Sequence, residues 1–314
     1  MGFLQGRSGG ILAGLLAGAL WGLVFVAPRM VLGQNDNNTV SFGSVDLAAG
    51  RFVSYGALSA LLMLLGWRTK KLPSLQQGIS ALGLSLLGFT GYYLLLVLAI
   101  NDAGTEMPTL IIGTIPVWVM LLGRPMGLSL RSLLPGLALT AGGLLLMGYA
   151  QLQTRPDVVA VQHAHYWRGI AYAVAAMLCW TAFAILNSVW LQKHRNISAS
   201  DWANWLGVAT GLGAWLLWLT AGTDVGVMAA DPKIAAFTTV CVLTGVGSAW
   251  LATIFWNIAS QELSASLCGQ LIVSETVFAL IYSAWWDGQW PGLQALVASV
   301  LFILGILASI KAHD

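Results

Sequence analysis

The chain has 314 residues, of which 58% are hydrophobic and 8% are charged, and its formal net charge is +2. Soluble domains carry about 25% charged residues, so a chain with so little charge and a mean hydropathy of +0.79 cannot cover a water-facing surface. The composition predicts a polytopic helical membrane protein. A transmembrane barrel is disfavoured because the apolar runs are continuous rather than alternating, and the small net charge gives no reason to expect nucleic acid as a partner.

Ten apolar segments of membrane-spanning length follow one another along the chain. They cover residues 9–32, 46–67, 75–99, 105–123, 131–151, 167–191, 201–221, 234–258, 263–286 and 291–311. Most connections are short, and the two longer ones are 33–44 and 153–166. We therefore predict an all-α fold with ten transmembrane helices.

The distribution of Lys and Arg predicts the orientation, because short cytoplasmic loops carry an excess of these residues. The side that holds the N-terminus collects Arg7, Arg68, Lys70, Lys71, Arg124, Arg131, Lys193, Arg195 and Lys311. The opposite side collects Arg29, Arg155, Arg168 and Lys233. We expect both termini to be cytoplasmic.

The two halves of the chain resemble one another. Trp21 aligns with Trp180 at a shift of 159, and Leu95–Asp102 aligns with Phe255–Glu262 at a shift of 160. Each half has five spans, an odd number, so the halves must insert with opposite topologies. We predict an inverted repeat with a first unit at 1–152, a connecting loop at 153–165 and a second unit at 166–314; the alternative is a chance alignment of apolar segments.

Several motifs carry a family resemblance. They are a Trp in the first helix of each half, A-A-G-R-F at 48–52, L-V-L-A-I-N-D-A-G at 96–104, and S-A-S-L-C-G-Q-L-I-V-S-E-T-V-F-A-L-I-Y at 264–282. In their order and spacing the chain resembles the drug/metabolite transporter superfamily, in particular its ten-helix EamA-type permeases. The resemblance implies alternating access through a central cavity lined by the first four helices of each half, with the fifth and tenth more peripheral. The chain departs from the family pattern at Glu275-Thr276, where Glu-Pro is usual. The resemblance therefore assigns neither a subfamily nor a substrate.

The resemblance and the repeat together predict a secondary active transporter of the inner (plasma) membrane. Export of amino acids, or of related amphipathic, aromatic or cationic solutes, is the main hypothesis. Uncoupled uptake or exchange of a polar metabolite is the alternative within transport, and an intramembrane enzyme or a non-transporting scaffold is the alternative of another class. The expected partners are a small-molecule solute and the lipid bilayer, and Gly142-Gly143 with Gly305 are weak candidates for a homodimer contact.

Glu275 is the leading functional candidate, because an ionisable residue near the middle of a membrane segment is costly and marks a functional site by default. A low-dielectric environment favours the neutral carboxyl, so Glu275 could carry a proton through a transport cycle. The alternative is a hydrogen-bonded carboxyl that ties two helices together. Gln270 and Ser274 are four residues apart on the same expected helix, which puts them on one face, either as solute ligands or as interhelical hydrogen-bond partners.

Aromatic residues repeat along the first helix of each half. Trp21, Phe25 and Arg29 lie at steps of four, and Trp180 and Asn187 lie seven apart. A pseudo-twofold axis would bring the two tryptophans to one cavity, where aromatic walls suit flat or cationic solutes. Helix packing is the alternative role.

The other candidates are polar or aromatic residues within spans. Trp256, Asn257 and Tyr92 could contact solute or neighbouring helices. Arg51 could bind a substrate carboxylate, reach the interface, or pair with Asp46.

Pro108 and Pro116 should interrupt the fourth helix and could form a gate. The ninth helix has no Pro, and Gly269 is its expected weak point. The four histidines lie in loops or at the terminus, and no phosphate-binding glycine loop is present, so we expect no catalytic, cofactor or metal site.

Overall fold

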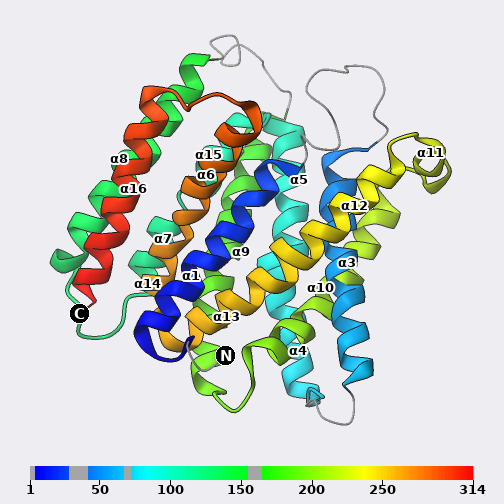
Figure 1. Cartoon of the computed structure of the whole chain (residues 1–314), viewed down its shortest axis with the longest axis horizontal. Coiled ribbons are helices and arrows are strands. Elements are labelled where there is room, and N and C mark those ends of the chain that lie inside the picture. Colours follow the sequence, from blue (N-terminus) through cyan, green and yellow to red (C-terminus); the bar gives the residue numbers. More distant parts are fainter. Residues whose placement is uncertain (1–3, 28–41, 67–71, 155–164, 314) are drawn as a thin grey trace.

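The computed structural model describes residues 4–27, 42–66, 72–154 and 165–313 (Figure 1). All regular elements in these ranges are helices. Both ends of the chain lie at one end of the bundle, shown at the bottom of Figure 1. The predicted all-α fold is confirmed.

The first half supplies five helical segments, two of which change character part-way. They are α1 (Gly6–Gly22) followed by the 3-10 turn η2 (Leu23–Phe25); α3 (Ser44–Leu65); α4 (Leu75–Ser85), η3 (Leu86–Thr90) and α5 (Gly91–Ala103) in one run; α6 (Glu106–Gly113) with α7 (Ile115–Leu122); and α8 (Leu130–Thr154).

The second half repeats this series, with one short extra helix, α11 (Val225–Ala230), between its second and third segments. The segments are α9 (Tyr166–Lys193); α10 (Ala199–Ala221); α12 (Ile234–Thr244), η5 (Gly245–Leu251) and α13 (Ala252–Glu262) in one run; α14 (Ala265–Ile272) with α15 (Ser274–Asp287); and α16 (Leu293–Ala312).

The predicted spans agree with these helices to within four residues at each described end. Residues 28–32 of the first predicted span, and with them Arg29, lie outside the described residues, as does most of the connecting loop 153–165. By length and composition, eight of the described helical segments can cross a membrane, and Met107–Leu122 is a shorter apolar one. The remaining segment, α10, is packed between α3 and α13.

Local irregularities recur at matching places in the two halves. The π-helical segments η3 and η5 begin at Leu86 and Gly245. The breaks between α6 and α7 and between α14 and α15 fall at Thr114 and Val273. In Figure 1, α1 starts at the end that holds the termini and α9 starts at the opposite end. These matches support the inverted repeat, while the boundaries 1–152 and 166–314 stay a prediction.

The fifth segment of each half lies at the side of the bundle, where α8 packs on α16 (Figure 1). A Cβ at Gly143 would lie 2.5 Å from the Phe302 ring, and one at Gly305 would lie 2.8 Å from Oγ1 of Thr140. These glycines therefore allow α8 and α16 to approach each other within one chain. Gly143 and Gly305 thus meet a helix of the same chain, and a homodimer contact through α8 and α16 stays a prediction.

Candidate functional site

Three tryptophans from three helices meet at the centre of the bundle. Trp21 of α1 lies 6.2 Å from Trp180 of α9 and 5.4 Å from Trp256 of α13, and the last two are 6.1 Å apart between ring centroids. Trp256 is buried, whereas Trp21 and Trp180 are half-buried. We call these residues the central tryptophan cluster. The sequence repeat predicted that Trp21 and Trp180 would lie close together, and the structure places them in edge contact.

An aromatic wall connects this cluster to α3. Trp180 lies 6.0 Å from Phe183, Phe183 lies 5.4 Å from Phe89, and Phe89 lies 5.8 Å from Phe52. The wall therefore joins α1, α9, η3 and α3, which come from both halves of the chain. Phe52 is the neighbour of Arg51, so a guanidinium stands at one end of the wall and the tryptophans at the other.

Tyr92 and Tyr93 begin α5 beside this wall, and their rings lie 5.4 Å apart in a T-shaped contact. Tyr92 packs against the hydrophobic core that includes Trp21 and Trp180. Tyr93 turns the other way, where its hydroxyl accepts a hydrogen bond from Arg51. Tyr92 therefore packs on the same core as the central tryptophan cluster, and Tyr93 carries the contact with the cation.

Glu275 occupies the first turn of α15, directly after the break at Val273, and its side chain is half-buried. Its backbone N would lie 3.2 Å from a Cβ at Gly18, so α1 and α15 are in close contact here. Glu275 belongs to the second half of the chain, whereas Arg51 and Tyr92 belong to the first.

Gln270 and Ser274 contact different helices, since Ser274 lies against Gly18 of α1 and Gln270 bonds to α8 and α16. The helix is broken at Val273, between them, and the spacing rule of a continuous helix no longer applies. The Gln270 amide donates to Thr140 Oγ1 at 2.8 Å and its carbonyl oxygen accepts from Ser309 at 3.2 Å, which joins α14 to α8 and α16. Ser274 donates instead to the backbone oxygen of Leu271 at 2.7 Å. Both side chains are buried in contacts within the protein.

Asn187 and Asn257 form a buried network between α9, α10 and α13. The Asn187 amide donates to Oδ1 of Asn257 at 3.2 Å, and Asn187 Oδ1 accepts from Trp202 Nε1 at 2.8 Å. Asn257 donates to the backbone oxygen of Ala199 at 3.2 Å. Neither side chain has any exposed surface, so in this structure both serve helix packing.

The proline prediction for the fourth helix was partly wrong. Pro108 lies in the first turn of α6 and interrupts nothing, since the first N–H groups of a helix have no intrahelical acceptor. The break occurs at Thr114, and Pro116 falls in the first turn of α7. Gly269 does not mark the break in the ninth segment either. It is the point at which α14 crosses α7, where an added Cβ would lie 2.7 Å from Val119.

Two further expectations at helix ends fail for local reasons. Phe25 leaves the stripe of Trp21 because α1 ends at Gly22 and continues as a 3-10 turn, and Phe25 is 55% exposed. Asp46 does not pair with Arg51. Its carboxylate accepts from the backbone N of Gly43 at 2.7 Å, from Trp218 Nε1 at 3.0 Å, and from the N and hydroxyl of Thr223 at 2.9 and 2.7 Å.

Residues 8–149, which run from α1 into α8, match the model of the EamA-like transporter family. The chain therefore carries an EamA-like transporter domain. This match over the first half agrees with the resemblance to the drug/metabolite transporter superfamily that the order and spacing of the motifs indicated.

The EamA-like chain is also similar to individual proteins over nearly its full length. It is 29% identical over 316 residues to the inner membrane protein YtfF of Escherichia coli (strain K12), covering 96% of this chain and 95% of YtfF. A crystal structure shares its fold with a TM-score of 0.72 at 16% identity, covering 98% of this chain and 99% of the other. The latter similarity establishes the fold alone.

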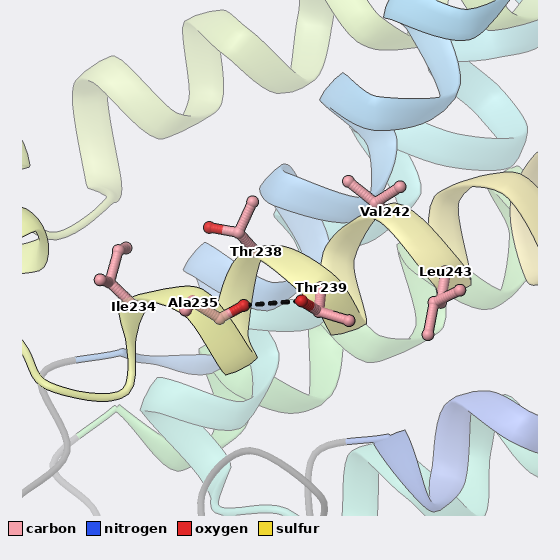
Figure 2. Close-up of a pocket in the computed structure, with 6 residues that line it drawn as sticks. All are labelled: Ile234, Ala235, Thr238, Thr239, Val242 and Leu243. Atoms are coloured by element: carbon pink, nitrogen blue, oxygen red, sulfur yellow. Dashed lines mark hydrogen bonds between the residues drawn. The ribbon is translucent and has the colours of Figure 1, made fainter.

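None of the three tryptophans of the central cluster lines the hollow drawn in Figure 2. Its lining comes from a single helix, α12, and consists of Ile234, Ala235, Thr238, Thr239, Val242 and Leu243. The Thr239 hydroxyl donates back to the Ala235 oxygen at 2.8 Å, so it is already bonded within the helix. An apolar outer face of this kind suits contact with lipid and carries no convergent polar groups.

Sequence reasoning missed several residues around the EamA-like site. Phe89 and Phe183 complete the aromatic wall, but isolated Phe residues in apolar helices give no signal that distinguishes them from ordinary packing. Thr140 was missed as the partner of Gln270 because the two residues are distant in sequence. The repeat offered a usable signal only for Thr114, which aligns with Ser274 at the shift of 160 already established.

Proposed function

We propose that this protein is a secondary active transporter that exports small organic solutes across the inner (plasma) membrane by alternating access. The observation that carries the proposal is the meeting of Trp21, Trp180 and Trp256, from both halves, beside the half-buried Tyr92 and Glu275. Inverted-repeat transporters bind their substrates near the midplane between the repeats. Membership of the EamA-like family and similarity to an inner membrane protein support the class and the location.

A difference in burial between matching helices supports alternating access. All eight residues of α14, on the side of the termini, are buried. Its counterpart α6, on the opposite side, has one buried residue, Pro108, among its described side chains. We infer that this conformation is sealed on the terminal side and more open on the other. If α14 became exposed as α6 is now, and α6 became buried as α14 is now, the sealed side would open.

The central residues suggest an amphipathic solute with an aromatic or cationic part. Tryptophan faces attract cations and stack on flat groups, and Trp21 and Trp180 retain exposed surface. Amino acids and their relatives meet this description and are our leading class. We place the termini in the cytoplasm because Lys and Arg are concentrated on their side.

Proton coupling through Glu275 forms part of the proposal. A carboxyl between α15 and α1 that alternates between neutral and charged forms would respond to solute binding and to the face that is open. With a pH gradient imposed, we expect Glu275→Gln to abolish the dependence of transport on that gradient while exchange of solute continues. Asp287→Asn is the control, since Asp287 is an exposed acid at the end of the same helix. Continued response of the Gln variant to the gradient would exclude Glu275 as the coupling residue.

Counterflow in proteoliposomes with a broad solute panel tests the transport function itself. Liposomes are loaded with each unlabelled solute, and transient accumulation of its labelled form is measured. We expect accumulation for at least one class of amphipathic solute. If no solute in the panel moves, the result favours the alternatives of a membrane enzyme or a non-transporting scaffold. If solute transport by the native chain does not change when a pH gradient is imposed, the result favours uncoupled uptake or exchange.

A further inference from the structure

Arg51 is a buried cation with an unused hydrogen-bond donor. Its side chain is 8% exposed, and its Nη2 donates to the Tyr93 hydroxyl at 2.5 Å. The guanidinium carbon lies 4.6 Å from the centroid of the Phe52 ring and 5.2 Å from that of Tyr93. Its Nε is buried and has no hydrogen-bond partner among the described residues. A buried donor without an acceptor costs free energy. An acceptor bound to Arg51 Nε would remove this cost.

The described part of the chain supplies no ion-pair partner for Arg51. Asp46 is the nearest acid in the sequence, and its carboxylate accepts hydrogen bonds from Gly43, Trp218 and Thr223. No hydrogen bond or ion pair joins Glu275 to Arg51 in the described residues. The positive charge is therefore only partly compensated by the protein.

Arg51 is also too deep to act as an interfacial anchor. A snorkelling arginine places its head group at the membrane surface. The partner of Arg51 is instead Tyr93, which lies close to the middle of the continuous helical segment Leu75–Ala103. Because the head group stacks on Phe52 and Tyr93, it is held in the interior of the bundle rather than at its end.

The aromatic wall connects Arg51 to the central tryptophan cluster. Phe52, Phe89 and Phe183 run from the guanidinium to Trp180, with successive ring centroids between 5.4 and 6.0 Å apart. The rings of Phe52, Phe89 and Phe183 are buried in this structure. An organic solute that reaches them when the bundle opens would meet aromatic faces over its apolar part and Arg51 at one end. Planar guanidinium forks match carboxylate geometry and form charge-assisted hydrogen bonds that are stronger than neutral ones.

We propose that Arg51 binds a carboxylate of the transported solute, so that this protein prefers organic acids and zwitterions over the corresponding esters and amines. This inference rests on the proposed transport function and adds to it the chemical group that the solute must carry. The free Nε and the remaining guanidinium donors are the groups that engage the carboxylate oxygens.

The test compares two solutes that carry a free carboxylate with one in which the carboxylate is esterified. L-phenylalanine, L-phenylalanine methyl ester and 3-phenylpropionate share a ring that suits the aromatic wall, and the matched leucine series replaces the ring by an aliphatic group. Each compound competes with a transported solute from the counterflow panel, and its half-inhibitory concentration is measured on the full chain in proteoliposomes. A charge-assisted contact of this kind predicts that the acids compete at least about tenfold better than their esters.

Arg51→Gln should remove the preference for the acids while the esters compete as before, and Arg51→Lys should retain a reduced preference because it keeps the charge without the fork. Arg131→Gln, at an exposed position, is the control and should retain the preference of the native chain. Size-exclusion chromatography checks that each variant is folded. If Arg51→Gln does not fold, the inference is tested by the ratio of the half-inhibitory concentrations of ester and acid, measured for the native chain and for Arg51→Lys.

Two results would overturn the inference while leaving transport intact. One is equal competition by acids and esters in the native chain. The other is an unchanged ratio in a folded Arg51→Gln variant. If no solute of the broad panel moves at all, the transport proposal itself fails, and the role of Arg51 fails with it.

Discussion

Gly56 of α3 and Gly211 of α10 form a helix crossing that should not tolerate a methyl group. A Cβ on Gly56 would lie 2.5 Å from the Cα of Gly211 and 3.0 Å from the oxygen of Gly207. The reverse substitution is equally close, with 2.7 Å from a Cβ on Gly211 to the Cα of Gly56. Because the obstructing atoms belong to the backbone, no side chain can rotate away, and the two helices themselves must separate.

The required movement sets the size of the effect. Ordinary van der Waals contact begins at 3.4 Å, so relief of a 2.5 Å approach needs a shift of about 1 Å. Overpacking of this kind costs about 1–3 kcal/mol, whereas Ala gains roughly 0.5–1 kcal/mol over Gly as a helix former. We expect Gly56→Ala to lower the free energy of unfolding by about 1–2 kcal/mol net.

Gly83→Ala is the matched control, because an added Cβ on Gly83 in α4 meets no atom of the described chain within 4 Å. This variant should be slightly more stable than the native chain. The apparent Tm of the purified protein in detergent, followed by its intrinsic tryptophan fluorescence, measures both. With roughly 2–4 °C per kcal/mol, Gly56→Ala should melt several degrees below Gly83→Ala.

A double substitution adds a second check. Once Gly56→Ala has separated α3 from α10, space exists for a methyl group at Gly211, so the pair should cost less than the sum of the single changes. Additive losses, or a Gly56→Ala variant as stable as Gly83→Ala, would refute the tight crossing.

Two smaller changes test other contacts. Asn187→Ala should lower the free energy of unfolding by about 1–3 kcal/mol, because it leaves the buried Trp202 indole N–H without its acceptor; a Tm equal to that of the native chain would contradict the network. Asp102→Asn should cost less than about 1 kcal/mol, since its partner Arg168 is 52% exposed and the 2.6 Å ion pair joins α5 to α9 near solvent. Its effect on Tm should vanish in high salt, and a loss that persists there would mean that Asp102 acts through something other than charge.

The helical frame could be predicted closely because a membrane span needs about twenty apolar residues and charged or polar connections mark its ends. The proximity of Trp21 and Trp180 could also be predicted, since a repeat with opposite insertion relates matching positions by a twofold axis. The hydrogen-bond partners of the buried polar side chains could not be predicted. Whether the Gln270 amide meets solute or Thr140 depends on how α14 sits against α8, which no local pattern encodes. The same holds for Asp46, whose partners Trp218 and Thr223 come from the other half.

The breaks between α6 and α7 and between α14 and α15 have a physical cause that the sequence analysis did not identify. A proline was expected to break the fourth segment, and the ninth, lacking one, was expected to behave differently; both break at the matching place. Thr114 donates to the oxygen of Ile111 at 2.6 Å, and Ser274 donates to the oxygen of Leu271 at 2.7 Å. A hydroxyl that bonds the carbonyl three residues earlier competes with the helical hydrogen bond and bends the helix.

The sequence predicted Ser274 either as a solute ligand or as an interhelical hydrogen-bond partner, and its hydroxyl instead donates to the backbone of its own helix. A polar residue in the middle of an apolar helix has two ways to satisfy its hydrogen bonds, by a partner across the interface or by its own backbone. Ser274 uses the second, and the consequence is the break that places Glu275 in the first turn of a new helix. The break, rather than the serine itself, therefore sets the backbone position of Glu275, whose N lies against Gly18 of α1.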